Sequence, residues 1–298
     1  MNKMREVSNE GRELINSFIS SLSEKNLNSK TIQEYSADLK HFIGWHEYQG
    51  MDTCQNMLIF SFDQICVREL ETYKEAMQNL KLKPSTINRR ISTLKLFFDW
   101  AYHCGLSVRN PAKHVRLNPV QKGKPREITQ DEEKRLLDTV KSHGTLRDQA
   151  MLKLMIHTGI RVGEACSLMI SDISVSKKSG SISIVSGSQT RKIPLNYACA
   201  SALERYVSSL KIAGDGPLFR SEKTGEKLTE RAVRYIVRKY MVLAGLEGLS
   251  AYSFRHSFGY KKAQSTSLHK LADIMGHSNL STTMSYVKAS DEESKGNE

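Results

Sequence analysis

A proline-rich, basic segment interrupts the chain between about Asn110 and Arg126, in the run NPAKHVRLNPVQKGKPRE. Proline fixes φ and removes a backbone donor, so we expect this segment to be extended rather than helical. The chain has 298 residues, which is longer than one typical hydrophobic core requires. We therefore expect a helical N-terminal domain over 1–110, a basic linker over 111–126, a second domain over 127–290 and an acidic tail over 291–298.

Positive charge dominates the composition. The chain carries 44 Lys and Arg against 32 Asp and Glu, a net charge of +12, and most of the surplus follows the linker. Such a balance indicates a polyanionic partner, of which nucleic acid is the commonest. The linker lysines fit contact with a phosphate backbone as well as they fit a flexible, solvated connector.

Several protein classes are excluded by composition. With 39% hydrophobic and 26% charged residues the chain is an ordinary globular mixture. It contains no apolar run of about 18 residues, as a membrane span needs, and its start lacks the apolar stretch of a signal peptide. The odd number of scattered cysteines suggests neither a disulfide framework nor a structural zinc site. We expect a cytoplasmic protein without membrane contact; the cysteines are Cys54, Cys66, Cys104, Cys166 and Cys199.

Helical periodicity fills the N-terminal part. Apolar residues recur at three- and four-residue steps, at Ile32, Tyr35, Leu39 and Phe42, and at Ile87, Ile91, Leu94 and Phe98. This predicts a compact bundle of about four helices, with Thr31 and Ser85 as N-caps. Asn88, Arg89 and Arg90 lie off the second stripe, where a solvated polar face is a commoner role than contact with DNA.

The C-terminal part mixes helices with one β signal. Thr129-Gln-Asp-Glu132 is a capping-box pattern, and a helix over 147–157 should end at Gly159 in a left-handed cap. The alternation over 181–185 and 191–195, around Gly187-Ser188, predicts an antiparallel hairpin. The expected fold is mainly α with a small antiparallel β-hairpin. A later helix carries an apolar stripe formed by Val233, Ile236, Val237 and Tyr240. Beside it lies a basic stripe of Arg231, Arg234 and Arg238, which fits contact with phosphates as well as it fits a solvated surface.

Four runs of the C-terminal part carry residues suited to phosphate chemistry: TGIRVGEACSL, YSFRHSF, LADIMGHSNL and STTMSY. In the first, Arg161 follows a glycine turn at a helix start, where a guanidinium can be aimed at an anion. The others contain Arg255, a histidine after glycine (His277) and a later tyrosine (Tyr286). Each residue alone is commonplace, and their order and spacing carry the signal.

These runs, in this order, resemble the boxes of a tyrosine recombinase of the phage-integrase type, and their pattern is similar to its short Xer-like members. The first box resembles the one with the first catalytic arginine, SFRHSF the one with the second, and MGHSNLSTTMSY the one with the histidine and the nucleophilic tyrosine. The run KPSTINRRISTLKLFFDWAYHCGLSVRNPA resembles the family's helical core-binding domain. The resemblance covers residues 28–287 and implies that domain followed by a catalytic one.

The resemblance implies a mechanism. Tyr286 would attack a scissile DNA phosphodiester and form a 3′-phosphotyrosine, which conserves the energy of the broken bond. Arg161 and Arg255 would neutralise the non-bridging oxygens, and His277 would hydrogen-bond the same phosphate. No metal or other cofactor is implied, because the two guanidinium groups supply the positive charge. The implied partners are double-stranded DNA, gripped by both domains, and further copies of the chain in a homo-tetramer on paired DNA sites.

Two positions depart from the family pattern. The family's catalytic lysine on the hairpin, eight residues before Pro-Leu, falls here on Ser186, so the usual general acid is missing from its place. Tyr252 stands where the family usually has a histidine, and a phenol with a pKa near 10 is a poor base at neutral pH. Neighbouring cations out of register are Lys177, Lys178, Arg191 and Lys192.

Three explanations remain open for these departures, of which we favour the first. A lysine is supplied from a shifted hairpin register, the enzyme is slow and uses water or Ser186 as proton donor, or the protein is a catalytically weakened DNA-binding factor. A monomeric relaxing topoisomerase would share the chemistry. His256 is interpreted as a supporting residue. Among recombinase roles, integration, excision and resolution of DNA all fit the sequence, and the short N-terminal segment favours a simple Xer-like or transposon-borne recombinase.

Overall fold

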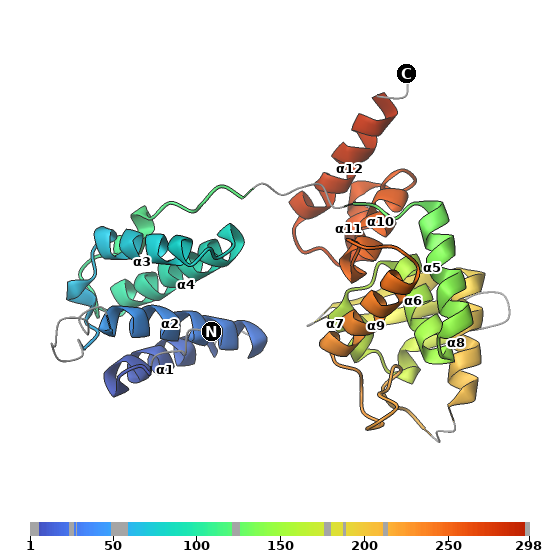
Figure 1. Ribbon diagram of the computed structural model, residues 1–298, viewed down its shortest axis with the longest axis horizontal. Helices are drawn as coiled ribbons and strands as arrows, with labels where there is room; N and C mark the ends of the chain where they lie inside the picture. The colour runs from blue at the N-terminus through green and yellow to red at the C-terminus, as the bar shows by residue number, and fades with distance from the viewer. Residues whose placement is uncertain are drawn as a thin grey trace. The chain divides into compact units, whose positions relative to one another are not determined.

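The chain divides into two compact units, Met1–Gly123 and Lys124–Glu298, in the computed structural model (Figure 1). The structure describes residues 6–23, 27, 29–48, 59–120, 126–175, 180–186, 189–210 and 214–295. Within these ranges none of the helices combines the length and the apolar character that a membrane crossing needs. Each unit has its own hydrophobic core. The mainly helical fold with a small antiparallel sheet is confirmed.

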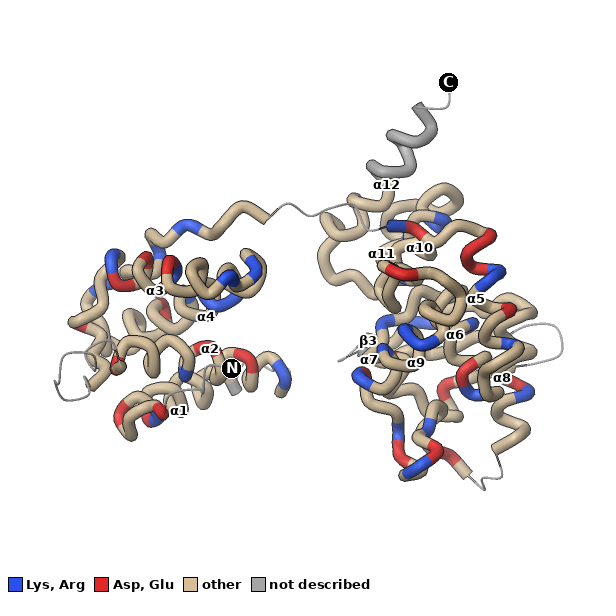
Figure 2. The backbone as a smooth tube through the Cα atoms, in the orientation of Figure 1, with Lys and Arg blue, Asp and Glu red and all other residues tan. Residues whose placement is uncertain are grey.

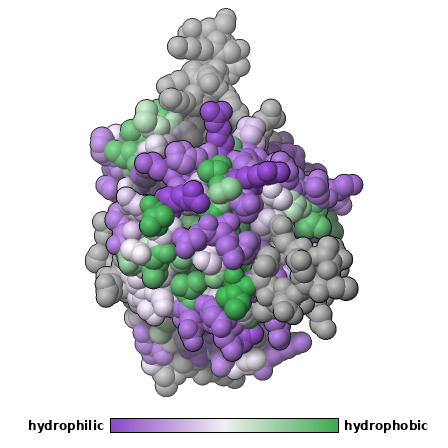
Figure 3. All heavy atoms as spheres, turned by 90° about the vertical axis from the view of Figure 1, so that its left-hand side faces the viewer, coloured by the Kyte–Doolittle hydropathy of each residue, from purple (hydrophilic) through white to green (hydrophobic). Residues whose placement is uncertain are grey.

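The first unit is a helical bundle with an aromatic core. Phe42, Phe97 and Phe98 are fully buried and pack edge to face against one another and their neighbours. In the view of Figure 3 the surface is mostly hydrophilic, with smaller hydrophobic areas between. The α-helices of this unit are α1 (Asn9–Ser23), α2 (Ser29–Glu47), α3 (Val67–Asn79) and α4 (Pro84–His103).

Two helix starts in this unit differ from the sequence expectation. Helix α2 begins at Ser29, before the expected cap at Thr31. Helix α4 begins at Pro84 with Lys83 at the N-cap, so Ser85 lies inside the first turn. Proline is favoured at the first helical position because its fixed φ matches the helix and its missing N–H would have no partner there.

The face around Arg89 and Arg90 carries an ion-pair cluster, in which Arg89 is 42% exposed, as expected for a solvated face, and Arg90 is 17% exposed. The Arg89 Nη1 donates to Asp38 Oδ2 at 2.5 Å, and the Arg90 Nε lies 3.7 Å from Asp38 Oδ1. Asp38 is only 2% exposed and also accepts a hydrogen bond from Thr93. A buried carboxylate requires such partners, so the two arginines join α4 to α2, while the Arg89 side chain also reaches solvent.

The expected linker begins later than residue 111. Pro111–His114 form a short 3₁₀ helix, η3, capped by the Asn110 side chain. Its Ala112 and the following Val115 are buried in the core of the first unit, which is why this stretch folds despite its prolines. Further on, Asn88 of α4 pairs with the backbone of Asn118 in both directions, at 2.7 and 2.8 Å.

The second unit places helices around a small sheet. The Thr129–Glu132 capping box is present, and Gly159 ends α6 (Leu146–Thr158) with φ of 60°, as predicted. The arginines at 231, 234 and 238 are exposed on α9 (Glu230–Leu243), and the Lys and Arg positions among the described residues are blue in Figure 2. The helices before the last three are α5 (Gln130–His143), α6 (Leu146–Thr158), α7 (Val162–Ser167), α8 (Tyr197–Ser209) and α9 (Glu230–Leu243).

The sheet contains the predicted hairpin and one further strand. Strands β1 (Ile173–Val175), β2 (Gly180–Ser186) and β3 (Gln189–Leu195) pair antiparallel in that order. Ile182 pairs with Ile193 and Ile184 with Arg191. Because side chains alternate between faces, Arg191 lies on the same face of β3 as Ile193, which is buried.

The last three helices form a subcluster of the second unit, coloured orange to red in Figure 1. Phe258 of α10 (Ala251–Ala263), Leu271 and Met275 of α11 (Leu268–Met275), and Tyr286 of α12 (Leu280–Lys295) pack together. Helix α12 continues to Lys295, so residues 291–295, expected in a solvated tail, are helical. The glutamates and the lysine in this stretch favour a helix.

Candidate active site

Arg161 is placed by the turn between α6 and α7. Gly159 adopts a left-handed conformation, and a Cβ at this position would lie 2.5 Å from the Phe258 ring, so the turn needs glycine. Arg161 then forms the N-cap of α7. Its Nη2 donates to the Gly276 carbonyl at 2.7 Å and its Nη1 to Glu164 Oε1 at 2.9 Å. The side chain is 41% exposed, so an anion can reach it.

Arg255 projects from α10 into the interior and is 5% exposed. Its Nη1 donates to the Gly159 carbonyl at 2.7 Å, and its Nη2 donates to the Met275 carbonyl at 2.5 Å. The same Nη2 lies 2.9 Å from His277 Nε2. Burial, together with the charge of Arg161, lowers the pKa of Arg255 to about 10, so the guanidinium is still charged at neutral pH.

His277 follows the left-handed Gly276 that ends α11. A guanidinium can only donate, so Nε2 accepts from Arg255 and the ring proton resides on Nδ1. Nδ1 then donates to the Thr283 hydroxyl at 2.8 Å. Burial lowers the pKa of His277 to about 4, with Arg255 and Arg161 acting in the same direction. The imidazole is therefore neutral at pH 7.

Tyr286 completes the group from α12. Its ring stacks on the His277 ring at a centroid distance of 6.1 Å and an interplanar angle of 7°. The side chain is only 2% exposed, and burial raises the pKa of its phenol to about 12. The structure thus brings Arg255, His277 and Tyr286 into one cluster, joined to Arg161 through Gly276.

The comparisons with known proteins identify the family of this chain. Residues 126–293 match the model of the phage integrase family, and residues 15–105 match that of its N-terminal SAM-like domain. The chain belongs to the phage integrase family. It is a tyrosine recombinase of the Xer-like kind, similar to the tyrosine recombinase XerC of Bacillus pumilus, with 30% identity over 291 residues that cover 93% of this chain and 92% of the relative.

Further relatives support the same family and fold. The tyrosine recombinase of Pseudothermotoga lettingae is 28% identical over 273 residues, which cover 90% of this chain and 91% of the relative. The fold resembles that of the Tn1549 transposon integrase solved with circular intermediate DNA, with a TM-score of 0.74, 16% identity and coverage of 95% and 98%. The fold also resembles that of XerH recombinase bound to its difH substrate, with a TM-score of 0.69 and 19% identity. The match covers 96% of this chain and 88% of that chain.

The structure also locates the two departures of this tyrosine recombinase. Lys192 pairs with Ser183 and lies on the opposite face of β3 from Arg191. Tyr252 is 62% exposed, and its ring meets the His256 ring edge-on at 4.3 Å. Ser186 pairs with Gln189 at the end of the hairpin. The side chain of Ser186, and all of Lys177 and Lys178, lie outside the described residues.

Three side chains hold the site together, of which sequence reasoning missed Glu164 and Thr283 and named Arg191 only as a cation out of register. Glu164 accepts from Arg161 and, through both oxygens, from Arg191. Burial raises the pKa of Glu164, but the bonds from Arg191 and Arg161 outweigh it and the pKa is lowered, so the carboxylate is charged. Thr283 is fully buried beneath His277. The signal for Glu164 was its place as the third residue of α7, and the signal for Arg191 was its inward position on β3. No sequence pattern pointed to Thr283.

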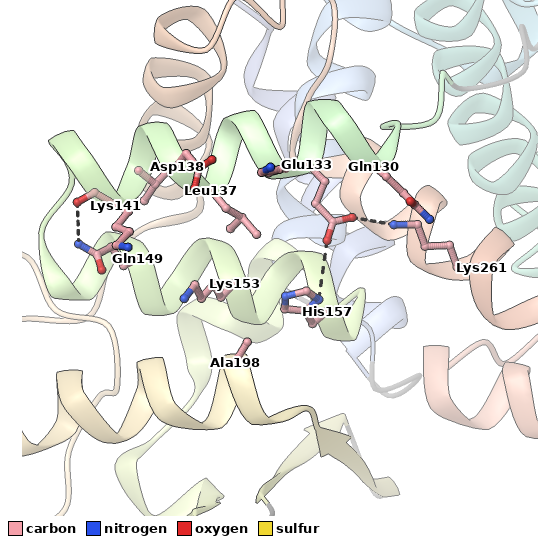
Figure 4. Close-up of a pocket in the computed structure, with 12 residues that line it drawn as sticks. Gln130, Glu133, Leu137, Asp138, Lys141, Gln149, Lys153, His157, Ala198 and Lys261 are labelled. Atoms are coloured by element: carbon pink, nitrogen blue, oxygen red, sulfur yellow. Dashed lines mark hydrogen bonds and ion pairs between the residues drawn. The ribbon is translucent and has the colours of Figure 1, made fainter.

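A separate pocket lies between α5, α6 and α8, and Figure 4 shows Glu133 pointing between Lys261 and His157. Glu133 accepts a hydrogen bond from the Lys261 Nζ at 2.6 Å, while His157 Nδ1 is 4.0 Å from it. This contact ties α10, which carries Arg255, to α5. Within the described ranges, no cluster of three or more His, Cys, Asp or Glu side chains could hold a metal ion.

Gly259→Ala should expel Tyr286 from its buried position. A Cβ at Gly259 would lie 2.8 Å from the Tyr286 Cε1, and real contacts of this kind are not that short. We expect nitration of Tyr286 without DNA, followed by peptide mass spectrometry, to become several-fold faster than in the parent protein. Lys262→Ala, an exposed change on the same helix, should leave the rate as it is. Equal rates in all three proteins would contradict the packing described.

Stability should fall as the pH drops from about 6.5 towards 4. The pKa of His277 in the folded state is about 4 against an ordinary 6.5, so the unfolded chain binds more protons in this window. The contribution of neutral His277 to the free energy of unfolding is therefore complete above pH 6.5, and it is lost as the pH falls towards the folded-state pKa of about 4. We expect a lower urea midpoint at pH 5 than at pH 7.5, and a smaller difference in His277→Gln. An NMR titration that gave His277 an ordinary pKa would refute this.

Proposed function

We propose that this tyrosine recombinase is a site-specific DNA recombinase in which Tyr286 forms a 3′-phosphotyrosine intermediate. The observation that carries the proposal is the contact of Arg255 with His277 at 2.9 Å, together with the stacking of the His277 ring on that of Tyr286. Two guanidinium groups, an imidazole and a phenol in one cluster are suited to phosphoryl transfer without a metal ion. Integration, excision and resolution of DNA all use this chemistry.

In the first step the Tyr286 Oη loses its proton and attacks the phosphorus, the bond between phosphorus and the 5′-oxygen breaks, and that oxygen takes up one proton and leaves as a 5′-hydroxyl. Arg161 and Arg255 stabilise the charge on the non-bridging oxygens, and each such preorganised donor is typically worth about 10²–10³ in rate. Rejoining is the reverse attack by a 5′-hydroxyl. The covalent intermediate retains the bond energy, so no nucleotide cofactor is needed.

The site must rearrange when DNA binds. Arg255 donates hydrogen bonds to the Gly159 and Met275 carbonyls and to His277, and His277 donates its only N–H to Thr283. Tyr286 is buried, and a phenol with a pKa of about 12 is a weak nucleophile. We infer that a bound phosphate draws Arg255 and His277 to itself and that α12 shifts to present the Tyr286 hydroxyl. The structure therefore corresponds to a resting form.

The partner that we propose is double-stranded DNA. The exposed Arg231, Arg234 and Arg238 follow one face of α9, beside Tyr235, which is 71% exposed. Arginines on such a face neutralise phosphates independently of sequence. Both XerH and the Tn1549 integrase were solved with DNA, which supports this partner. We further propose that four copies act on two paired sites.

The proposal is tested by covalent trapping. Duplexes that bind the protein are first selected from random sequence, and the recovered site is then prepared with a nick next to the cleavage position. Escape of the short 5′-hydroxyl fragment prevents rejoining, so protein should accumulate on DNA and migrate as an adduct on denaturing gels. Tight, salt-dependent binding without an adduct would favour a non-catalytic DNA-binding factor. Relaxation of plasmids that lack paired sites would favour a topoisomerase.

A further inference from the structure

Arg191 reaches the active site from the hairpin, although it does not occupy the family's lysine position. Its side chain is 12% exposed and lies on the inner face of β3. Nη1 and Nη2 donate to the two oxygens of Glu164 at 2.9 and 2.8 Å, and Nε donates to the Ile274 carbonyl at 3.0 Å. All three donor directions of the guanidinium are thus used, and they link β3 to α7 and α11.

Glu164 stands between two arginines. Its Oε2 accepts from the backbone N–H of Arg161 at 2.9 Å, and its Oε1 accepts from the Arg161 Nη1 at the same distance. The first of these bonds caps α7, so the carboxylate is needed for the local fold. Its negative charge, however, opposes the charge that Arg161 offers to a phosphate.

Arg191 removes this conflict. Arg161, Arg255 and Arg191 together with the Glu164 carboxylate leave two positive charges, whereas without Arg191 they would leave one. A phosphodiester attacked by a phenolate passes through a species with two negative charges. In a water-poor site, fixed charges of opposite sign stabilise such a species strongly. The two positive charges that remain when Arg191 is present therefore match the two negative charges of that species.

Arg191 also packs against the turn that precedes His277. A Cβ at Gly276 would lie 2.7 Å from the Arg191 Nη1 and 3.2 Å from the Arg161 Nη1, so both guanidinium groups touch this glycine. Gly276 has a φ of 61°, and its carbonyl accepts the bond from Arg161. The position of this turn thus depends on both arginines.

We propose that Arg191 is a positioning residue of DNA cleavage, which neutralises Glu164 and so leaves the charge of Arg161 for the scissile phosphate. The inference rests on the proposed function. In a chain with serine at position 186, the hairpin supplies the site with a guanidinium instead of a lysine. Arginine does not deprotonate in proteins, so this contribution is electrostatic and is not that of a general acid.

The test compares Arg191→Gln, Arg191→Lys and the double variant Glu164→Gln/Arg191→Gln in single-turnover adduct formation. The substrates are the nicked duplex with a normal scissile phosphodiester and one with an uncharged methylphosphonate there. We expect Arg191→Gln to slow cleavage of the phosphodiester about 10²-fold and that of the methylphosphonate less than about tenfold. The double variant should recover part of the rate, because removing both charges restores the sum, and Arg191→Lys should be intermediate. Equal losses on both substrates, without recovery, would show a purely structural role and overturn the proposal.

A measurement without DNA separates this proposal from the proposed function. Arg191 is among the charges that lower the pKa of His277. An NMR titration of the His277 ring should therefore give a higher pKa in Arg191→Gln, and a value closer to that of the parent protein in the double variant, since Glu164 acts in the opposite direction. An unchanged pKa in folded Arg191→Gln would refute the charge balance. Failure of the parent protein to form any adduct would instead refute the proposed function.

Discussion

Tyr286→Phe should abolish the covalent adduct with nicked duplex DNA while leaving DNA binding and folding intact. The attacking atom is the phenolic oxygen, and no other atom of this side chain can form the bond to phosphorus. The ring packs with Phe258, Leu271 and Met275, and phenylalanine preserves that packing. We therefore expect adduct below detection on denaturing gels, at DNA concentrations where the variant and the parent protein bind equally.

The matched control for this result is Tyr260→Phe. The Tyr260 ring lies 5.1 Å from the Tyr286 ring, so the control removes a hydroxyl from the same aromatic cluster. This variant should still accumulate adduct. Persistence of the adduct in Tyr286→Phe, with its tryptic peptide mapping to another residue, would show that a different side chain is the nucleophile.

Local features of the fold could be predicted from the sequence because they depend on neighbours along the chain. The glycine cap at Gly159, the capping box at Thr129 and the hairpin over 181–195 each follow from a backbone preference of a few consecutive residues. The prediction that Arg161, Arg255, His277 and Tyr286 lie together rested on the family resemblance and not on periodicity. The first strand, Ile173–Val175, was missed because three residues give too short an alternation.

Contacts between distant segments could not be predicted in this way. The pair of Arg191 with Glu164 spans 27 positions, and that of Arg89 with Asp38 spans 51. Arginine is usually a surface residue, and only the carboxylate on another element shows that each of these two makes an ion pair within the fold. The same applies to the burial of Tyr286, which depends on Gly259, because a Cβ at that position would require the tyrosine ring to shift.

The second large effect is expected for Arg161→Ala, which should slow adduct formation about 10²–10³-fold, the usual loss for one preorganised donor in a transition state. Arg161 is the more exposed of the two proposed catalytic arginines, so its loss leaves the interior contacts of Arg255 in place. Glu164 keeps its two bonds to Arg191 and is not left as an unpaired buried charge. Folding should therefore persist, and the rate is measured by single-turnover trapping at saturating protein.

DNA binding should change far less than the rate. Affinity is distributed over many phosphate contacts, and the loss of one cation reduces the slope of log affinity against log salt by about 1. Arg135→Ala, an exposed change on α5, is the control and should cleave at the parental rate. Arg161→Lys should fall between the two, because a lysine retains the charge without the planar fork that can hold two oxygens. If Arg161→Ala instead bound tenfold more weakly yet cleaved normally at saturation, Arg161 would serve to hold DNA rather than to stabilise the transition state.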